Sequence, residues 1–269
     1  MAESTAAMQH IKKRLDEYMT EQSSATAPAA VAQTITKDFP ADADDHESYL
    51  GSVWQTVTKS AQDTPYHHPA QDKLVKMVSE IMLLPNDQEI RVWDEAYKWT
   101  DLPLLGAEFR DMINGPEMAD SEAEQGKINS SWINFHAFAA RLNGKGVTDW
   151  WDIPLWMLRQ GLEEDLSAED KLHDCHIMTA AQIIEHSGAI MLATKVLAHE
   201  ELDAQDKRMF AAGSLFKGEA GYSLERWTFW TGRLREEAEK CKSDEVKNAA
   251  LRAARLMDIW HGRSKAHSG

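Results

Sequence analysis

The sequence predicts an all-α protein, a single-domain bundle of about ten helices. Apolar residues recur three and four positions apart over most of the 269 residues, a spacing that places them on one face of a helix. No long run of alternating β-branched residues, the pattern of a half-buried strand, is found. Pro and Gly close several of the periodic stretches, as expected where helices end. A chain of this length can bury a substantial core.

Two helices are expected in an N-terminal segment of residues 1–40. The first covers about residues 6–18, and its apolar stripe is formed by Met8, Ile11, Leu15 and Tyr18. A Ser/Ala-rich connection leads to a short second helix that ends near Phe39.

The main helical domain is expected over residues 41–262. The acidic stretch ADADDHES opens its first helix, because negative charge favours the positive end of the helix dipole, and Pro65 ends that helix. HPAQDKLVKMVSEIMLLP predicts the next helix, closed by Pro85. The pattern at residues 93–98 is short and ambiguous, and the acidic segment 115–126 predicts an exposed loop.

Helices resume at WINFHAFAARL, residues 132–142, where GKG follows as a stop. SAED at 167–170 has the form of a capping box and predicts the start of the longest helix. Three further helical patterns follow, at 204–216, 223–240 and 244–260. Residues 263–269 are expected to form a disordered tail.

Charge and composition narrow the partners and the compartment. The net charge of -15 comes from 29 basic and 44 acidic residues, a field that repels phosphate backbones, so no nucleic-acid partner is expected. No run reaches the roughly 18 apolar residues of a membrane span. Two cysteines, Cys175 and Cys241, cannot form a disulfide framework, which fits a reducing compartment. The sequence therefore predicts a cytoplasmic protein.

One five-residue pattern occurs twice, as WTDLP at 99–103 and WWDIP at 150–154. Asp is a good N-cap and Pro is tolerated in the first helical turn, so both copies indicate the start of a helix. No third copy follows at the same interval, which argues against a repeat protein. The alternative is that Asp101 and Asp152 are paired acids in one site.

The candidate catalytic residues are two histidines. His136 stands beside an apolar helix face, so its imidazole points inward or to the edge of the core, where an aromatic pocket with one titratable group suits acid–base work on a small hydrophobic molecule. His176 is the second candidate. The candidate substrate-binding residues are Trp132, Phe135, Trp227 and Trp230. The alternative is that all of these are core residues, with Arg226 pairing with an acid or stacking on a ring.

No metal or other cofactor is predicted. His173 and His176 are three apart and share a helix face, so with His136 or a carboxylate they could bind Zn or Fe, but no His-Glu-x-x-His pattern accompanies them. DDHE at 44–47 resembles an aspartate-rich Mg²⁺ motif, yet it sits at a helix start. Gly-x-Ser-x-Gly, Gly-x-Gly-x-x-Gly and P-loop patterns are absent.

Four segments occur in an order that resembles the fungal family called domain of unknown function 3632. They are WTDLPLLGAEFRD, WINFHAFAARL, CHIMTAAQIIEHSGAIML and GSLFKGEAGYSLERWTFWTGRL. The resemblance covers about residues 45–260 and implies a cytosolic all-helical domain, often encoded beside genes for small-molecule biosynthesis. It implies no catalytic residue. One position departs from the family, where Ile183 stands in place of a Trp.

Two functions remain open. The first is a cofactor-independent small-molecule enzyme, such as a cyclase, isomerase or hydrolase-like accessory of a biosynthetic pathway, because ten Trp and twelve Met suit an adaptable pocket for a small hydrophobic molecule. The second is a noncatalytic protein-interaction or scaffold protein, in which the aromatic residues fill helix-packing layers and the partner is another protein.

Overall fold

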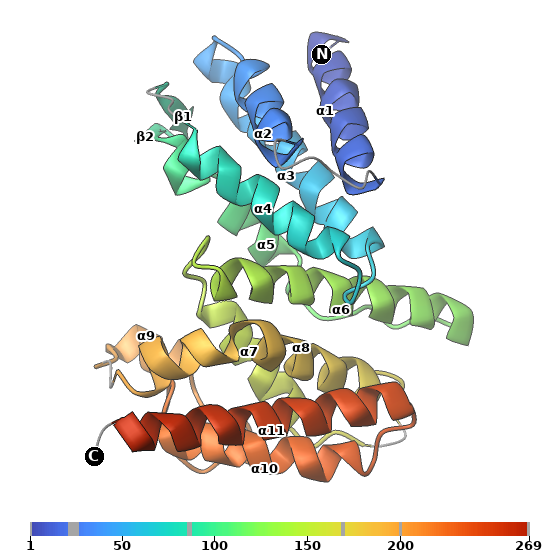
Figure 1. Cartoon of the computed structure of the whole chain (residues 1–269), viewed down its shortest axis with the longest axis vertical. Coiled ribbons are helices and arrows are strands. Elements are labelled where there is room, and N and C mark those ends of the chain that lie inside the picture. Colours follow the sequence, from blue (N-terminus) through green and yellow to red (C-terminus); the bar gives the residue numbers. More distant parts are fainter. Residues whose placement is uncertain (1, 21–26, 85–87, 168–169, 199–200, 268–269) are drawn as a thin grey trace. The chain divides into compact units, whose positions relative to one another are not determined.

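The computed structural model describes residues 2–20, 27–84, 88–167, 170–198 and 201–267, and it confirms the all-α class (Figure 1). The described residues form eleven α-helices and one two-stranded sheet. The chain divides into two compact units, Met1–Gly115 and Pro116–Gly269. The expected boundary at residue 40 lies inside the first unit.

The described residues of unit 1 form five α-helices, a hairpin and two 3₁₀ turns. In chain order they are α1 (Ala2–Thr20), α2 (Ala27–Lys37), η1 (Ala43–Asp45), α3 (His46–Asp63), α4 (Ala70–Leu83), β1 (Ile90–Val92), β2 (Glu95–Tyr97), η2 (Trp99–Asp101) and α5 (Leu105–Asp111). Helix α3 supplies the centre of its core, where Val53, Trp54 and Val57 are fully buried. The indole N–H of Trp54 donates to the Pro103 carbonyl at 2.7 Å, which ties α3 to the residues before α5.

The stretch that the sequence left ambiguous is an antiparallel hairpin, with Ile90 opposite Tyr97. Its two-residue turn consists of Trp93 and Asp94, both in the left-handed region at φ 52° and 64°. Such a turn matches the twist of the flanking strands, although Asn-Gly is its usual sequence. Trp93 is 62% exposed at this turn.

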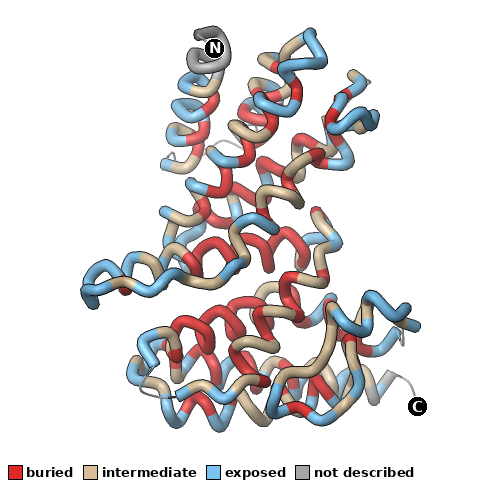
Figure 2. The backbone as a smooth tube through the Cα atoms, turned by 180° about the vertical axis from the view of Figure 1, so that it is seen from behind, coloured by how far each residue is buried: buried red, intermediate tan, exposed pale blue. Residues whose placement is uncertain are grey.

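In the part of unit 2 that the structure describes there are six α-helices and a π-helical turn: α6 (Glu122–Gly144), α7 (Asp152–Leu162), α8 (His173–Met191), η3 (Leu192–Val196), α9 (Ala204–Met209), α10 (Leu224–Ala238) and α11 (Asp244–His267). Helix α8 packs against α6, α7, α10 and α11. Most of its residues are buried, because a helix with neighbours on several sides has no broad polar face. Figure 2 shows these buried stretches within each unit.

Close helix contacts in unit 2 depend on small residues. A Cβ added to Gly144 would lie 1.9 Å from the backbone oxygen of His186, so α6 and α8 meet backbone to backbone at this point. A Cβ at Gly161 would lie 2.9 Å from the backbone oxygen of His176, so α7 also approaches the backbone of α8, though less closely. These contacts position the histidines of α8.

Several boundaries differ from the sequence prediction. Helix α9, expected over residues 204–216, ends at Met209. Helix α6 begins at Glu122, inside the expected loop, because the Ser121 side chain caps the helix by accepting from the Glu124 amide at 3.2 Å. Helix α8 begins at His173, not at the SAED pattern, of which residues 168–169 lie outside the described part of the chain. Helix α11 continues to His267, since no Pro or further Gly interrupts it after Gly262, so most of the expected tail is helical.

The doubled pattern occupies two different positions relative to its helices. In WWDIP the helix begins at Asp152 itself, and the Asp152 carboxylate accepts from the Ile153 amide at 3.0 Å. In WTDLP only Trp99–Asp101 form a 3₁₀ turn, in which the Asp101 carboxylate accepts from the Lys98 amide at 2.7 Å, and α5 begins two residues after Pro103. Both aspartates therefore accept local backbone hydrogen bonds.

Among the described residues, no helix combines the length and the apolar character that crossing a bilayer requires.

Candidate functional site

The candidate residues of α6 are inside unit 2. His136 is fully buried, and its ring lies 4.2 Å from the ring of Trp132 and 5.2 Å from that of Phe135. Its Nδ1 lies 2.9 Å from the Trp132 carbonyl oxygen, which can only accept, so Nδ1 carries the hydrogen. Burial lowers the pKa of His136 to about 4, against the hydrogen bond to the Trp132 carbonyl, which raises it. The imidazole is therefore neutral near pH 7 and presents a lone pair at Nε2.

Helix α8 brings His176 into the same region. Its side chain is buried, and burial lowers its pKa to about 4, although the charge of Asp170 acts in the opposite direction. The charge of His176 also contributes to lowering the pKa of His136, because α6 and α8 pack against each other. The two candidate histidines thus form a pair of neutral imidazoles in the core.

Three of the six candidate residues carry a buried nitrogen without a hydrogen-bond partner among the described residues. These atoms are Nε1 of Trp132, Nε2 of His136 and Nε1 of Trp227. Buried polar atoms in native proteins are nearly always paired, so each of these nitrogens requires an explanation. The two grooves found on unit 1, between α1 and α3 and along α1, are lined by none of the six residues.

Trp230 belongs to a different arrangement, an ion pair between Arg226 and an acid that the sequence could not identify. Glu163 and Arg226 are both fully buried and bond twice, at 2.6 and 2.9 Å. The Trp230 indole donates to the same carboxylate at 2.6 Å, and the Gly213 amide donates to it at 2.8 Å. Arg226 also stacks on the Trp230 ring, with Cζ 5.5 Å from the ring centroid, so it both pairs with an acid and stacks on an aromatic ring.

The remaining donors of Arg226 hold the connection between α9 and α10. Its guanidinium donates to the carbonyls of Phe210, Ala211 and Gly221 at 2.9, 3.2 and 2.9 Å. All five N–H groups of the side chain are therefore used. This arrangement fixes a chain segment and leaves no group free for chemistry.

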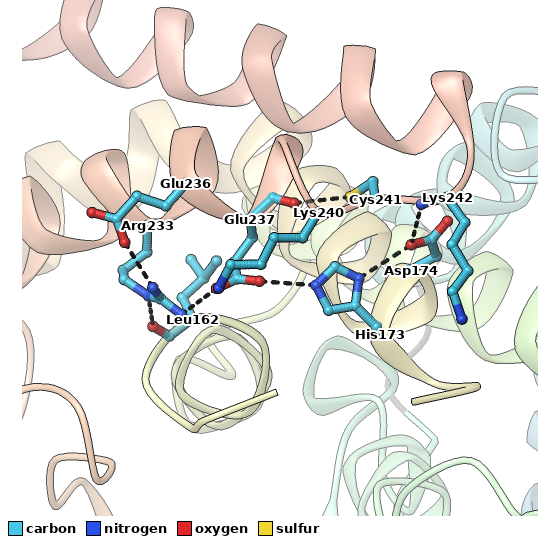
Figure 3. Close-up of polar contacts among 9 residues, drawn as sticks. All are labelled: Leu162, His173, Asp174, Arg233, Glu236, Glu237, Lys240, Cys241 and Lys242. Carbon is cyan, nitrogen blue, oxygen red and sulfur yellow. Dashed lines mark hydrogen bonds and ion pairs between the residues drawn. The ribbon is translucent and has the colours of Figure 1, made fainter. Parts of the chain in front are cut away.

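A second group of polar residues, the His173 cluster, consists of His173, Asp174, Glu237 and Cys241 (Figure 3). His173 and Asp174 begin α8, Glu237 is in the last turn of α10, and Cys241 lies between α10 and α11. Nε2 of His173 lies 2.8 Å from Oε2 of Glu237, and Nδ1 lies 3.1 Å from Oδ1 of Asp174. His173 and Glu237 are buried, whereas the Asp174 side chain is 24% exposed.

Glu237 remains ionised in this cluster. Burial alone would raise the pKa of Glu237, but the hydrogen bonds from Lys240 and His173 and the charge of Arg233 together hold it below its usual value. Lys240 Nζ lies 2.9 Å from Oε1, and Arg233 pairs with the same oxygen. Two positive side chains thus accompany the carboxylate that faces His173.

Cys241 is a thiol and not a thiolate in this environment. Burial, followed by the charges of Asp174 and Glu237, raises its pKa to about 12. Its Sγ donates to the Glu237 carbonyl oxygen at 3.3 Å. One ligand atom each from His173, Asp174 and Cys241 lie within 4.8 Å of one another, which is the grouping of possible metal ligands found in the described residues. His176, which the sequence paired with His173, is outside this grouping.

Comparison with known proteins gives one match. A family model described as "Protein of unknown function (DUF3632)" matches residues 54–234. The matched range includes His136, His173 and Arg226 and ends before Glu237 and Cys241. Searches of curated proteins and of solved structures found no match.

Proposed function

The chain belongs to the family described as protein of unknown function (DUF3632), and from this premise we propose that it binds and converts a small hydrophobic molecule beside His136. The proposed class is a cofactor-independent enzyme, such as a cyclase, isomerase or hydrolase-like accessory of a fungal biosynthetic pathway in the cytoplasm. His136 and His176 are its proposed acid–base residues. Trp132, Phe135 and Trp227 contact the molecule, whereas Trp230 is left out because Glu163 binds its indole.

The observation that carries the proposal is the buried, unpartnered Nε2 of His136 beside the equally unpartnered Nε1 of Trp132. Leaving such a group unpaired costs about 1–3 kcal/mol of folding stability. A bound molecule that hydrogen-bonds to both nitrogens would offset this cost. The indole can only donate, and the neutral His136 can only accept at Nε2. One hydroxyl or enol group can accept from the first and donate to the second.

This pairing also indicates a chemical role. With its pKa lowered to about 4, His136 is unprotonated at neutral pH, so its Nε2 is available to accept a hydrogen bond from the hydroxyl or enol of a bound molecule and to orient that group for proton transfer. The surrounding aromatic rings exclude water, which strengthens the hydrogen bonds inside the site. A hydrophobic alcohol, phenol or enolisable ketone is the corresponding ligand class.

The test is a thermal-shift screen of the full chain with small hydrophobic alcohols, phenols and ketones, run on the wild type, His136→Leu and Phe138→Leu. We expect hydroxylated compounds to raise the Tm of the wild type, since a ligand at 100 times its Kd adds about 2.7 kcal/mol of stability. The shift should vanish in His136→Leu. It should persist in Phe138→Leu, a change of a buried apolar residue on the same helix. Equal shifts in all three proteins, or none in the wild type, would contradict the proposal.

A second function, protein interaction without catalysis, is favoured by a different observation. Trp93 is 62% exposed on the hairpin turn of unit 1, where its indole N–H donates to Glu47 at 3.2 Å. Exposed Trp residues often anchor protein interfaces. If no compound stabilises the wild type and Trp93→Ala abolishes binding of a partner that His136→Leu still binds, this function replaces the first.

A further inference from the structure

We propose that His173, Asp174 and Cys241 bind a divalent transition-metal ion of the Zn²⁺ class at the start of α8. The three residues provide one nitrogen, one carboxylate oxygen and one sulfur within 4.8 Å of one another. Zn²⁺ takes all three kinds of ligand, whereas Mg²⁺ and Ca²⁺ do not favour sulfur. Ligand atoms around tetrahedral zinc are about 3.3–3.8 Å apart. Small side-chain movements therefore suffice to complete the site.

Glu237 orients the His173 ring for metal binding through a hydrogen bond to its outer nitrogen. A carboxylate can only accept, so the His173 Nε2 that faces Glu237 at 2.8 Å carries a hydrogen. In the neutral ring this leaves the lone pair on Nδ1, which points toward Asp174 and Cys241 (Figure 3). A carboxylate on the outer nitrogen of a ligating histidine fixes the ring and increases its basicity.

The other ligands are also held in place. Oδ1 of Asp174 accepts from the Lys242 amide at 3.1 Å, and Oδ2 accepts from the Ser243 amide at 2.9 Å. Glu237 is itself fixed by Lys240, so the site has its orienting contacts before an ion arrives. Such preorganisation lowers the cost of binding.

The location suits an ion that enters from solvent. Asp174 is 24% exposed, and Cys241 is partly exposed in the connection between α10 and α11. Three protein ligands leave a fourth position for water, as in zinc sites with an exchangeable ligand. The ion would join the first turn of α8 to the α10–α11 connection and replace the proton of the Cys241 thiol.

The same contacts can exist without an ion, as a hydrogen-bonded network that joins α8 to α10. In that case a proton on Nδ1 makes the hydrogen bond to Asp174, and Cys241 contributes only its contact with the Glu237 carbonyl. The two states differ in whether the sulfur binds a metal. This difference can be measured directly, and it does not depend on the ligand proposed beside His136.

The experiment uses the full chain, freed of metal with a chelator and titrated with Co²⁺ alone and Zn²⁺ alone. Co²⁺ bound by a thiolate gives a near-ultraviolet charge-transfer band, which binding through the chain's 11 histidines does not produce. We expect one ion per chain, this band, and a rise in Tm with Zn²⁺. Cys241→Ser should abolish the band. Cys175→Ser removes the other free thiol, which is buried on α8, and should leave the band intact.

A second variant weakens the site without removing any of its three ligands. Glu237→Gln keeps the size of the side chain but weakens the support of His173, so we expect the metal affinity to fall roughly 10- to 100-fold while the band remains at saturation. No binding of either ion by the wild type would overturn the proposal. So would a band that persists in Cys241→Ser, or an affinity that Cys241→Ser leaves unchanged.

Discussion

Replacing Glu163 should be the most destabilising single change in unit 2. Its carboxylate accepts four hydrogen bonds, two from Arg226 and one each from Trp230 and Gly213, and the side chains of Glu163, Arg226 and Trp230 are fully buried. Glu163→Ala would leave the Arg226 charge uncompensated in the core. The variant would also leave the Trp230 indole and the Gly213 amide without their acceptor.

The expected loss follows from these contacts. Breaking a buried ion pair by removing one partner costs about 3–5 kcal/mol. Each further donor left unpaired costs about 1–3 kcal/mol, and the sum, even if not fully additive, approaches the total stability of about 5–15 kcal/mol of a typical domain. Glu163→Gln keeps an acceptor oxygen and should lose less. We therefore expect Glu163→Ala to unfold unit 2 at room temperature and Glu163→Gln to destabilise it measurably.

The assay is urea unfolding of Glu163→Gln, Arg226→Met and the double variant, followed by circular dichroism and by amide exchange at Gly213. The double variant should be less destabilised than the sum of the single variants by about 0.5–3 kcal/mol, because neither partner is then left charged alone. The Gly213 amide should lose protection in Glu163→Gln, since it donates to that carboxylate at 2.8 Å. Glu164→Ala is the matched control, as that side chain is only partly buried.

Three results would refute this reasoning. They are a Glu163→Ala variant that stays folded at room temperature, additive single variants in the cycle, and a loss as large in Glu164→Ala as in Glu163→Gln. Any of them would mean that the pair is not the buried, fully bonded arrangement on which the magnitude depends.

Three further predictions concern the contact of α6 with α8. Gly144→Ala should destabilise unit 2 by at least about 1–3 kcal/mol in urea unfolding, because its Cβ would meet the His186 oxygen at 1.9 Å. The control is Gly126→Ala on the same helix, where the added Cβ has open space and should stabilise the protein by up to about 1 kcal/mol. The stability of unit 2 should fall as pH drops from 6.5 toward 4, by about 1.4 kcal/mol per pH unit for each of His136 and His176. Their pKa values are lowered to about 4 in the folded protein, so the unfolded chain binds protons first as the pH falls, and the contribution of these histidines to stability is complete only above pH 6.5. A stability that does not change between pH 6.5 and 4 in acid-unfolding measurements would contradict this prediction. His136→Leu should reduce that slope by about 1.4 kcal/mol per pH unit, because His176 still contributes its own part. The ligand-free variant should be at least as stable as the wild type, since it removes an unpaired buried nitrogen; a loss of several kcal/mol in denaturant unfolding would show that Nε2 has a partner.

Local sequence accounts for much of the fold. Helical periodicity fixed the all-α class, and the inward position expected for His136 agrees with its full burial. Boundaries were less predictable, because α6 begins ten residues before Trp132, at a cap that the acidic composition of residues 115–126 concealed. The hairpin at residues 90–97 has strands of three residues and an unusual turn sequence, so its local signal is weak.

The sequence by itself determined which residues lie on the apolar faces of helices and which chemical classes of partner its charge disfavours. Only the tertiary structure decided which polar side chains meet. Glu163 and Arg226 are 63 positions apart, and His173 and Glu237 are 64 apart. A helical period gives the direction of a side chain around its own axis, but the crossing of two helices and their relative rotation decide which atoms come within hydrogen-bond distance. For this reason the His173 cluster can be recognised only in the structure, where α8, α10 and α11 pack together.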